Sequence, residues 1–140
     1  GQGVHIDNKL PLSLPKNAGD VLVPCCSGGS AFPQGAEGRF SEVAGARQDS
    51  ARWGVGNPLY QDLIARTKAA LQKNPQNVLL AVWWMQGEFD SSAATHAQQA
   101  GRFTAILTPF RAALSVLNSQ CHGGRAAEGP WVCGAPSWYC

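Results

Sequence analysis

The sequence predicts an α/β fold built on parallel β-strands, and three observations lead to this prediction. Two short, continuous apolar runs, at residues 21–25 and 78–84, are typical of strands buried on both faces of a sheet. An amphipathic helical pattern separates the two runs, and a second helical pattern follows the later one. Strand, helix and strand in this order are typical of a βαβ unit in a parallel sheet.

The composition agrees with a single domain and excludes two classes of function. The chain has 140 residues, of which 44% are hydrophobic and 14% are charged, and its net charge is +2. The Lys and Arg residues are scattered, so we expect no nucleic-acid partner. The longest apolar run, at residues 78–85, is too short to cross a bilayer, so we expect no membrane partner. No leader pattern is visible, and neither the compartment nor the oligomeric state is predicted.

The part of the chain before residue 57 contains one predicted strand between irregular segments. Residues 1–19 are polar, lack a sustained period, and are expected to form a loop-like lead-in. The first predicted strand runs from Val21 to Cys25 and is bounded by Asp20 and by Gly28-Gly29. Residues 26–57 are glycine-rich and aperiodic, and a loop of this length is either functional or disordered.

Residues 57–84 are predicted to form a helix followed by the stronger of the two strands. Asn57 and Pro58 are typical of a helix N-cap and first turn, and the Asn-Pro pair at 74–75 ends the pattern. In the second strand, Trp83 and Trp84 point to opposite faces, so at least one of them is a core residue. Between the caps, the following residues recur at helical spacing: Leu59, Tyr60, Leu63, Ile64, Thr67, Ala70 and Leu71.

A second helix and an irregular tail are predicted for the rest of the chain. Residues 95–98 have the spacing of a capping box, and Pro109 is expected to kink or split the helix. Its apolar stripe consists of Phe103, Ile106, Leu107, Phe110, Leu114 and Leu117. Residues 121–140 are rich in Gly and Pro and are expected to be irregular. Two strands are too few for a finished sheet, so either further strands hide in residues 1–19 and 121–140 or the chain is part of a larger fold.

The five cysteines do not indicate a metal site. No Cys-x-x-Cys pair is present, so a zinc ribbon is not expected. Cys25 and Cys26 are expected to be buried, small apolar residues. Cys121, Cys133 and Cys140 are compatible with one disulfide if the protein is exported.

Candidate site residues follow the two apolar runs, because ligands of an open parallel sheet bind beyond the carboxyl ends of its strands. Gly29 in the turn after the first run allows a backbone N–H to face a small oxyanion, although such a turn is commonly nothing more than a turn. After the second run, Gln86 is able to aim its amide N–H at developing negative charge without adding a charge of its own. Glu88 and Asp90 either belong to the site or tie down the following loop through hydrogen bonds.

Together these segments resemble the sialate O-acetylesterase branch of the SGNH (GDSL-like) hydrolases. The residues that carry the resemblance are VPCCSGGSAF at 23–32, RWG at 52–54, PLY at 58–60 and WMQGEFD at 84–90. The resemblance covers about residues 18–134 and is closest to bacterial, often prophage-encoded esterases that remove 9-O-acetyl groups from sialic acid. It implies a flavodoxin-like α/β/α sandwich with parallel strands, here a partial one that lacks the first and last family elements.

The resemblance also implies roles for individual residues. Gly29 and Gln86 match the two donors of the oxyanion hole, and Glu88 and Asp90 match the acidic residues that brace the second segment. The expected substrate is O-acetylated sialic acid or a similar sugar ester, and no metal or other cofactor is expected. Contacts with the substrate are expected from Ser27, Ser30 and Trp53.

Two motifs of that family have no counterpart in the chain. The Gly-x-Ser-Asn segment that carries the nucleophile is absent, and so is the Asp-x-x-His pair. We therefore expect residues 1–140 to be a single partial domain, the truncated middle of a longer esterase, and we expect little esterase activity from this chain alone.

Two alternatives stay open at this stage. One is a self-sufficient hydrolase that uses Ser30 or Ser27 as nucleophile and His122 as base, although neither serine lies in a Gly-x-Ser-x-Gly elbow. The other is a non-catalytic remnant of the fold that binds a sugar or only packs. Ester hydrolysis that Ser30→Ala abolishes favours the first alternative, and sialic-acid binding without hydrolysis favours the second.

Overall fold

The computed structural model describes residues 19–25, 53–85 and 93–133. The predicted lead-in up to residue 18, the long loop at 26–52 and the end of the chain at 134–140 lie outside the described residues. The described elements, in chain order, are helix α2 (Pro58–Gln72), strand β1 (Val82–Trp84), helix α3 (Ala93–Ala113), the 3₁₀ turns η4 (Ser115–Gln120), η5 (His122–Gly124) and η6 (Ala126–Glu128), and strand β2 (Trp131–Cys133).

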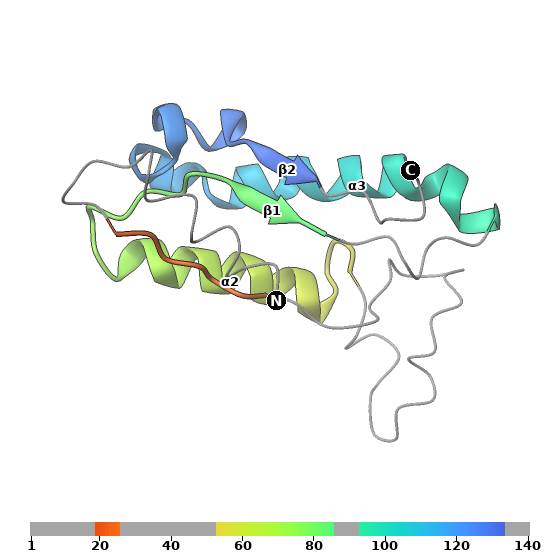
Figure 1. Ribbon diagram of the computed structural model, residues 1–140, viewed down its shortest axis with the longest axis horizontal. Helices are drawn as coiled ribbons and strands as arrows, with labels where there is room; N and C mark the ends of the chain where they lie inside the picture. Colours follow the sequence, from red (N-terminus) through yellow and green to blue (C-terminus); the bar gives the residue numbers. More distant parts are fainter. Residues whose placement is uncertain (1–18, 26–52, 86–92, 134–140) are drawn as a thin grey trace, which may run out of the picture.

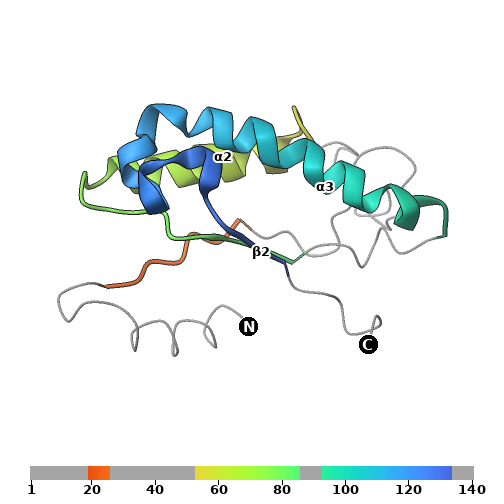
Figure 2. The same ribbon diagram turned by 90° about the horizontal axis from the view of Figure 1, so that it is seen from above.

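The two strands pair in parallel, and both long helices cover the same face of the pair (Figures 1 and 2). The register places Val82 opposite Trp131 and Trp84 opposite Cys133. An isolated parallel bridge between Leu79 and Cys121 extends the pairing toward the amino ends of the strands. The predicted α/β class with parallel strands is therefore confirmed.

The prediction of an irregular tail from residue 121 is wrong for the described part of that tail. Residues 122–128 form two 3₁₀ turns, and Trp131–Cys133 is the strand that pairs with β1. The sequence did leave open a strand hidden in this region. A strand of only three residues has too few positions to show a period of two. Gly129 and Pro130, directly before Trp131, are typical of a loop and do not indicate the start of a strand.

Helix α2 occupies the predicted range and buries the predicted stripe, including Tyr60, Leu63, Thr67 and Leu71. Asn57 stands at the N-cap with an extended backbone, but its side chain does not cap the helix. The Asn57 Nδ2 amide instead donates a hydrogen bond to the carbonyl oxygen of Trp53 at 3.2 Å. Asn57 therefore stabilises the turn at residues 53–57 that precedes the helix.

Helix α3 buries the centre of its predicted stripe, with Ile106, Phe110 and Leu114 each only 1% exposed. It starts at Ala93, ahead of the predicted cap at Thr95, and runs as one element through Pro109. Of the two outcomes expected for Pro109, a kink or a split, the split is wrong, because α3 continues through the proline and the buried residues on either side of it belong to one core.

The core lies between the two long helices and the sheet. Its largest fully buried side chains are Tyr60, Phe110, Ile106 and Leu114. The hydroxyl of Tyr60 donates a 2.8 Å hydrogen bond to the carbonyl oxygen of Ile106, which joins α2 to α3 inside the apolar layer. No helix in the described ranges is long and apolar enough to cross a bilayer.

The first predicted strand, Val21 to Cys25, is a third correction to the predicted fold. Residues 19–25 run along the edge of β1 that is opposite β2 and in the same direction, but they form no ladder (Figures 1 and 2). Val21 is 78% exposed and Val23 38% exposed, whereas a strand buried on both faces was expected. Pro24 has no N–H to offer a neighbouring strand. The segment is held instead by Arg66 of α2, whose Nη1 donates a 3.2 Å hydrogen bond to the carbonyl oxygen of Pro24.

Candidate active-site edge

The candidate site is built around the carboxyl edge of the sheet, which we define by Trp84 at the end of β1, by Met85 directly after it, and by Cys133 at the end of β2. The chain leaves the described fold at Met85 and, in the neighbouring segment, at Cys25. Because residues 19–25 and β1 run in the same direction, both exits lie toward the same edge (Figure 1). The sequence predicted that the two site-bearing segments start from one edge, and the described residues agree with that arrangement.

Six of the seven predicted site residues belong to these two segments and lie outside the described residues. They are Ser27, Gly29, Ser30, Gln86, Glu88 and Asp90. Their predicted roles, as oxyanion donors, bracing carboxylates and substrate contacts, remain predictions.

Trp53 is the predicted site residue that the structure does describe, and it lies against Trp84. The two indole rings meet edge to face, with their centroids 5.0 Å apart and their planes at 72°. Trp84 also contacts Phe103 of α3 and Trp131 of β2, at centroid distances of 6.0 Å and 5.7 Å. An aromatic cluster therefore supports the carboxyl edge from the side of the helices.

The burial of Trp53 bears on its predicted contact with a sugar. Trp53 is 6% exposed and Trp84 is 8% exposed, so both indoles act as core residues here. The prediction that at least one of Trp83 and Trp84 is a core residue is confirmed, since Trp84 packs in the cluster while Trp83 is half-buried. Trp53 is thus placed to support the edge, and sugar stacking by Trp53 remains a prediction.

Cys133 is the residue of the carboxyl edge that sequence reasoning missed. It was considered only as a possible disulfide partner, but the register puts it opposite Trp84. Neither Cys133 nor Cys121 is in a disulfide, and Cys25, which was expected to be buried, is only half-buried. Desolvation by the surrounding protein raises the pKa of the Cys133 thiol, which disfavours the thiolate that a cysteine nucleophile needs. The position of Cys133 at this edge follows from the strand register, which the sequence alone does not show.

His122, the proposed base of the alternative with a serine nucleophile from this chain, lies in the described part of the structure. His122 follows Cys121, which bridges to Leu79, and the His122 N–H donates a 2.9 Å hydrogen bond to the Leu79 carbonyl oxygen. Five residues of extended chain, about 16 Å, separate Leu79 from Trp84. His122 therefore lies at the amino end of the sheet with its side chain exposed, whereas Ser27 and Ser30 lie outside the described residues, so this alternative remains a prediction.

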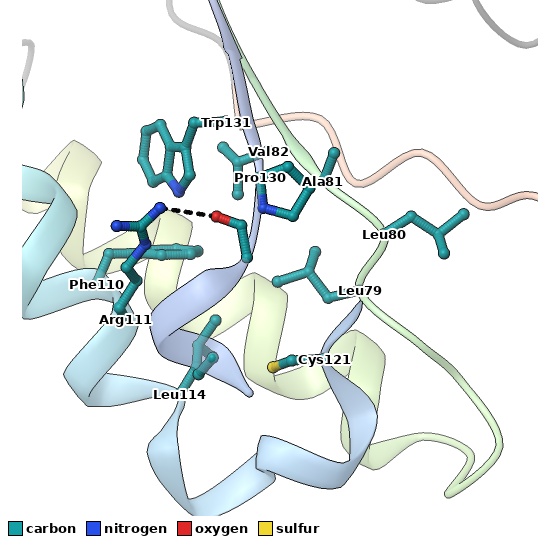
Figure 3. A pocket seen from close by; sticks show the side chains of 12 residues that line it. Leu79, Leu80, Ala81, Val82, Phe110, Arg111, Leu114, Cys121, Pro130 and Trp131 are labelled. Carbon is teal, nitrogen blue, oxygen red and sulfur yellow. Dashed lines mark hydrogen bonds between the residues drawn. The ribbon is translucent and has the colours of Figure 1, made fainter. Parts of the chain in front are cut away.

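A small cavity lies between α3, the chain before β1 and the chain before β2, near the amino end of the sheet (Figure 3). Its lining is mainly apolar, and it has room for about one water molecule. Arg111 reaches across it, and the Arg111 Nη2 donates a 2.9 Å hydrogen bond to the carbonyl oxygen of Gly129. The cavity is too small for a sugar, so it is a packing feature that links α3 to β2.

Comparison with known proteins identifies relatives of the chain. The family described as carbohydrate esterase, sialic acid-specific acetylesterase, matches residues 12–120. A protein of Escherichia coli (strain K12) named probable 9-O-acetyl-N-acetylneuraminic acid deacetylase is 48% identical over 139 residues, which are 99% of this chain and 42% of that protein. The crystal structure of NanS is similar with a TM-score of 0.80 and 49% identity, over 99% of this chain and 42% of that one.

These matches bear on the fold as well as on the family. The close similarity to a solved structure over nearly the whole chain confirms the predicted partial α/β sandwich. The chain spans about two fifths of the length of the relatives that it matches.

Proposed function

Because the chain belongs to the sialic acid-specific acetylesterase family of carbohydrate esterases, we propose that it takes part in removing O-acetyl groups from sialic acid or a related sugar. The observation that carries the proposal is the family match over residues 12–120. It is supported by the relative whose printed name is a 9-O-acetyl-N-acetylneuraminic acid deacetylase. In this proposal, residues 1–140 form one partial domain of the esterase.

The proposed contribution of this chain is stabilisation of the oxyanion. When an ester carbonyl is attacked, its oxygen becomes negative, and fixed N–H donors aimed at that oxygen lower the barrier. The backbone N–H of Gly29 and the side-chain amide of Gln86 are the proposed donors. Both are neutral, so they stabilise the developing charge without requiring a counter-ion. The described chain before each of these two segments ends toward the same edge of the sheet (Figure 1), which supports the proposal that the two donors converge.

The other predicted residues complete the proposed site. Glu88 and Asp90 hold the Gln86 segment through hydrogen bonds, and Ser27, Ser30 and Trp53 contact the sugar. The family resemblance implies a serine nucleophile and an Asp-x-x-His pair, and no match to either motif is present in these residues. We therefore expect ester hydrolysis only where a polypeptide supplies these groups, and a sugar-binding or purely structural part is the alternative.

The test is a chimera in which this chain replaces the matched 42% of the E. coli relative. The chimera is expected to release acetate from 9-O-acetyl-N-acetylneuraminic acid. Gln86→Ala is expected to lower kcat about 100- to 1,000-fold with a modest change in KM, because it removes a donor used in the transition state.

The matched control is Gln72→Ala, which makes the same chemical change at an exposed position near the end of α2. It is expected to leave kcat within about two-fold. A folded chimera that binds the sugar but releases no acetate would favour the non-catalytic alternative. A near-normal kcat for Gln86→Ala would remove that residue from the oxyanion hole.

A further inference from the structure

Arg66 on helix α2 links residues 19–25 to the helical layer through two directed contacts. Its Nε lies 2.7 Å from the Oδ2 of Asp62, one turn earlier on the same helix. Its Nη1 donates a 3.2 Å hydrogen bond to the carbonyl oxygen of Pro24. Because the two contacts use different nitrogens of one planar group, the contact with Asp62 fixes the direction in which Arg66 offers its second donor. The guanidinium therefore connects a carboxylate of α2 to the backbone of the neighbouring segment.

The backbone that Arg66 contacts is stiff. The ring of Pro24 fixes its own φ and restricts Val23 before it to extended conformations. Residues 19–25 form no ladder with β1, so the Pro24 carbonyl oxygen accepts from a side chain where a paired strand would offer a backbone N–H. The next residue, Cys25, packs against the buried core. Contacts at two successive residues thus hold the last described part of this segment.

This anchor is close in sequence to the proposed oxyanion donor Gly29. Gly29 follows Cys25 by four residues, which span at most about 14 Å of extended chain. In the other direction along the chain, the next described residue is Trp53. An oxyanion donor has to lie about 3 Å from the oxygen that becomes negative, and a displacement of about 1 Å can lower a rate about 100-fold. A small shift of Pro24 is therefore expected to affect the reaction more than it affects the fold.

We propose that Arg66 is a positioning residue for the esterase reaction, which holds the Pro24 backbone and, through it, the segment that carries Gly29. This inference rests on the proposed oxyanion role of Gly29. The side chains of Arg66 and Asp62 are 54% and 45% exposed, and exposed ion pairs contribute little to the free energy of unfolding. A merely structural pair would therefore leave kcat unchanged, whereas a positioning pair lowers kcat in a protein that stays folded.

The test uses the chimera with the E. coli relative and measures both acetate release from 9-O-acetyl-N-acetylneuraminic acid and urea denaturation. Arg66→Ala is expected to lower kcat at least about ten-fold, with KM within about three-fold and a denaturation midpoint close to that of the parent chimera. Arg66→Lys keeps the charge and one donor but lacks the planar group that makes both contacts. It is therefore expected to recover only part of the lost kcat.

A double-mutant cycle tests whether Asp62 acts through Arg66. Asp62→Ala releases the guanidinium from its partner on α2 and is expected to lower kcat about three-fold, less than Arg66→Ala does. The variant that carries both Asp62→Ala and Arg66→Ala is expected to be no slower than Arg66→Ala alone, because Asp62 has no further part once the guanidinium is gone.

The matched control is Arg125→Ala. Arg125 also forms an exposed ion pair, with Glu128 at 3.1 Å, but it precedes β2 at the amino end of the sheet. This variant is expected to keep kcat within about two-fold. If Arg66→Ala matched this control, or if it lowered the denaturation midpoint strongly, the inference would be overturned while the proposed function stood. Additive effects of the two substitutions in the cycle would overturn the part assigned to Asp62. A folded parent chimera that releases no acetate would overturn the proposed function, and this inference with it.

Discussion

Trp53 and Trp84 meet edge to face with their ring centroids 5.0 Å apart, and this contact joins the ends of the two segments that carry the predicted oxyanion donors. Trp53 directly follows the segment that contains Gly29. Trp84 ends β1, two residues before Gln86. A buried aromatic pair therefore fixes the described residues from which the two segments continue.

Trp53→Ala is expected to destabilise the chain by about 3–5 kcal/mol, the usual cost of deleting a buried aromatic side chain. Trp53→Phe keeps a ring against Trp84 and is expected to cost less. Urea denaturation followed by circular dichroism measures both. Val55→Ala, two residues along in the same turn and 57% exposed in the parent, is the control, with an expected change within about 0.5 kcal/mol. A cost for Trp53→Ala no greater than that of the control would show that the pair does not support this edge.

Gln120 holds together the end of α2 and the turn that leads to β1. Its Nε2 amide lies within hydrogen-bond distance of three carbonyl oxygens, at 2.7 Å from Leu71, 3.0 Å from Asn74 and 3.0 Å from Asn77. Helix C-termini leave carbonyl groups without intrahelical partners, and this buried amide satisfies them from a distant part of the chain. Gln120→Ala is expected to cost about 1–3 kcal/mol, because buried acceptors lose their donor.

Gln120→Glu gives the sharper version of this test. A carboxylate would face three carbonyl oxygens, so the folded state would raise the carboxyl pKa and favour the protonated form. The variant is expected to be less stable than Gln120→Ala at pH 7 and to recover stability as the pH falls toward 4. Urea denaturation at both pH values measures this, with the exposed Gln72→Glu as the control. A pH-independent loss would contradict the hydrogen-bonded role of Gln120.

The helices could be predicted from the sequence because each is long enough to display its period. The α2 stripe and the α3 stripe each span several turns, and Pro58 marks the start of α2. Val21 to Cys25 shows the opposite case. Its apolar run has the composition of a buried strand, but burial depends on covering residues, and the described residues leave Val21 and Val23 exposed.

From the sequence, the site could be assigned to the carboxyl edge of the sheet, but the side chains that support this edge could not be predicted. Strand order gives the edge, since parallel strands bring their carboxyl ends together. Gln120 and Cys133 were missed because each acquires its partners through tertiary contact, with Leu71 in one case and with the strand register in the other. A glutamine in an exposed-looking turn carries no local signal that three distant carbonyl groups need a donor.

Pro109→Ala is expected to stabilise α3 by about 1–3 kcal/mol. Pro109 lies inside the helix, where it offers no N–H to the carbonyl oxygen of Ala105, and alanine restores that donor. The ring of Pro109 is half-buried, so the gain is reduced by some lost packing. Thermal unfolding compares the variant with Thr108→Ala, an exposed neighbour expected to change stability by less than about 0.5 kcal/mol. A destabilised Pro109→Ala would show that α3 is shaped around the proline.

Alkaline pH is expected to destabilise the protein through Tyr60. Burial raises the pKa of Tyr60 to about 12 from its ordinary value of 10, and its hydroxyl donates to the Ile106 carbonyl oxygen at 2.8 Å. Below pH 10 the phenol is protonated in both the folded and the unfolded state, so its contribution to stability is fully present. Between pH 10 and pH 12 the unfolded state releases the proton more readily, and roughly 2 kcal/mol of stability is lost over that interval.

Tyr60→Phe isolates this contribution. At pH 8 the variant is expected to be about 1 kcal/mol less stable than the parent, because the hydrogen bond to the Ile106 carbonyl oxygen is lost. As the pH rises past 10 the parent loses the contribution of Tyr60 while the variant has none to lose, so the difference shrinks and then reverses. Urea denaturation of both proteins at pH 8, 10 and 11.5 measures the difference directly. A constant difference across these pH values would mean that Tyr60 titrates alike in the folded and unfolded states, and that the hydrogen bond to α3 does not depend on a buried, protonated phenol.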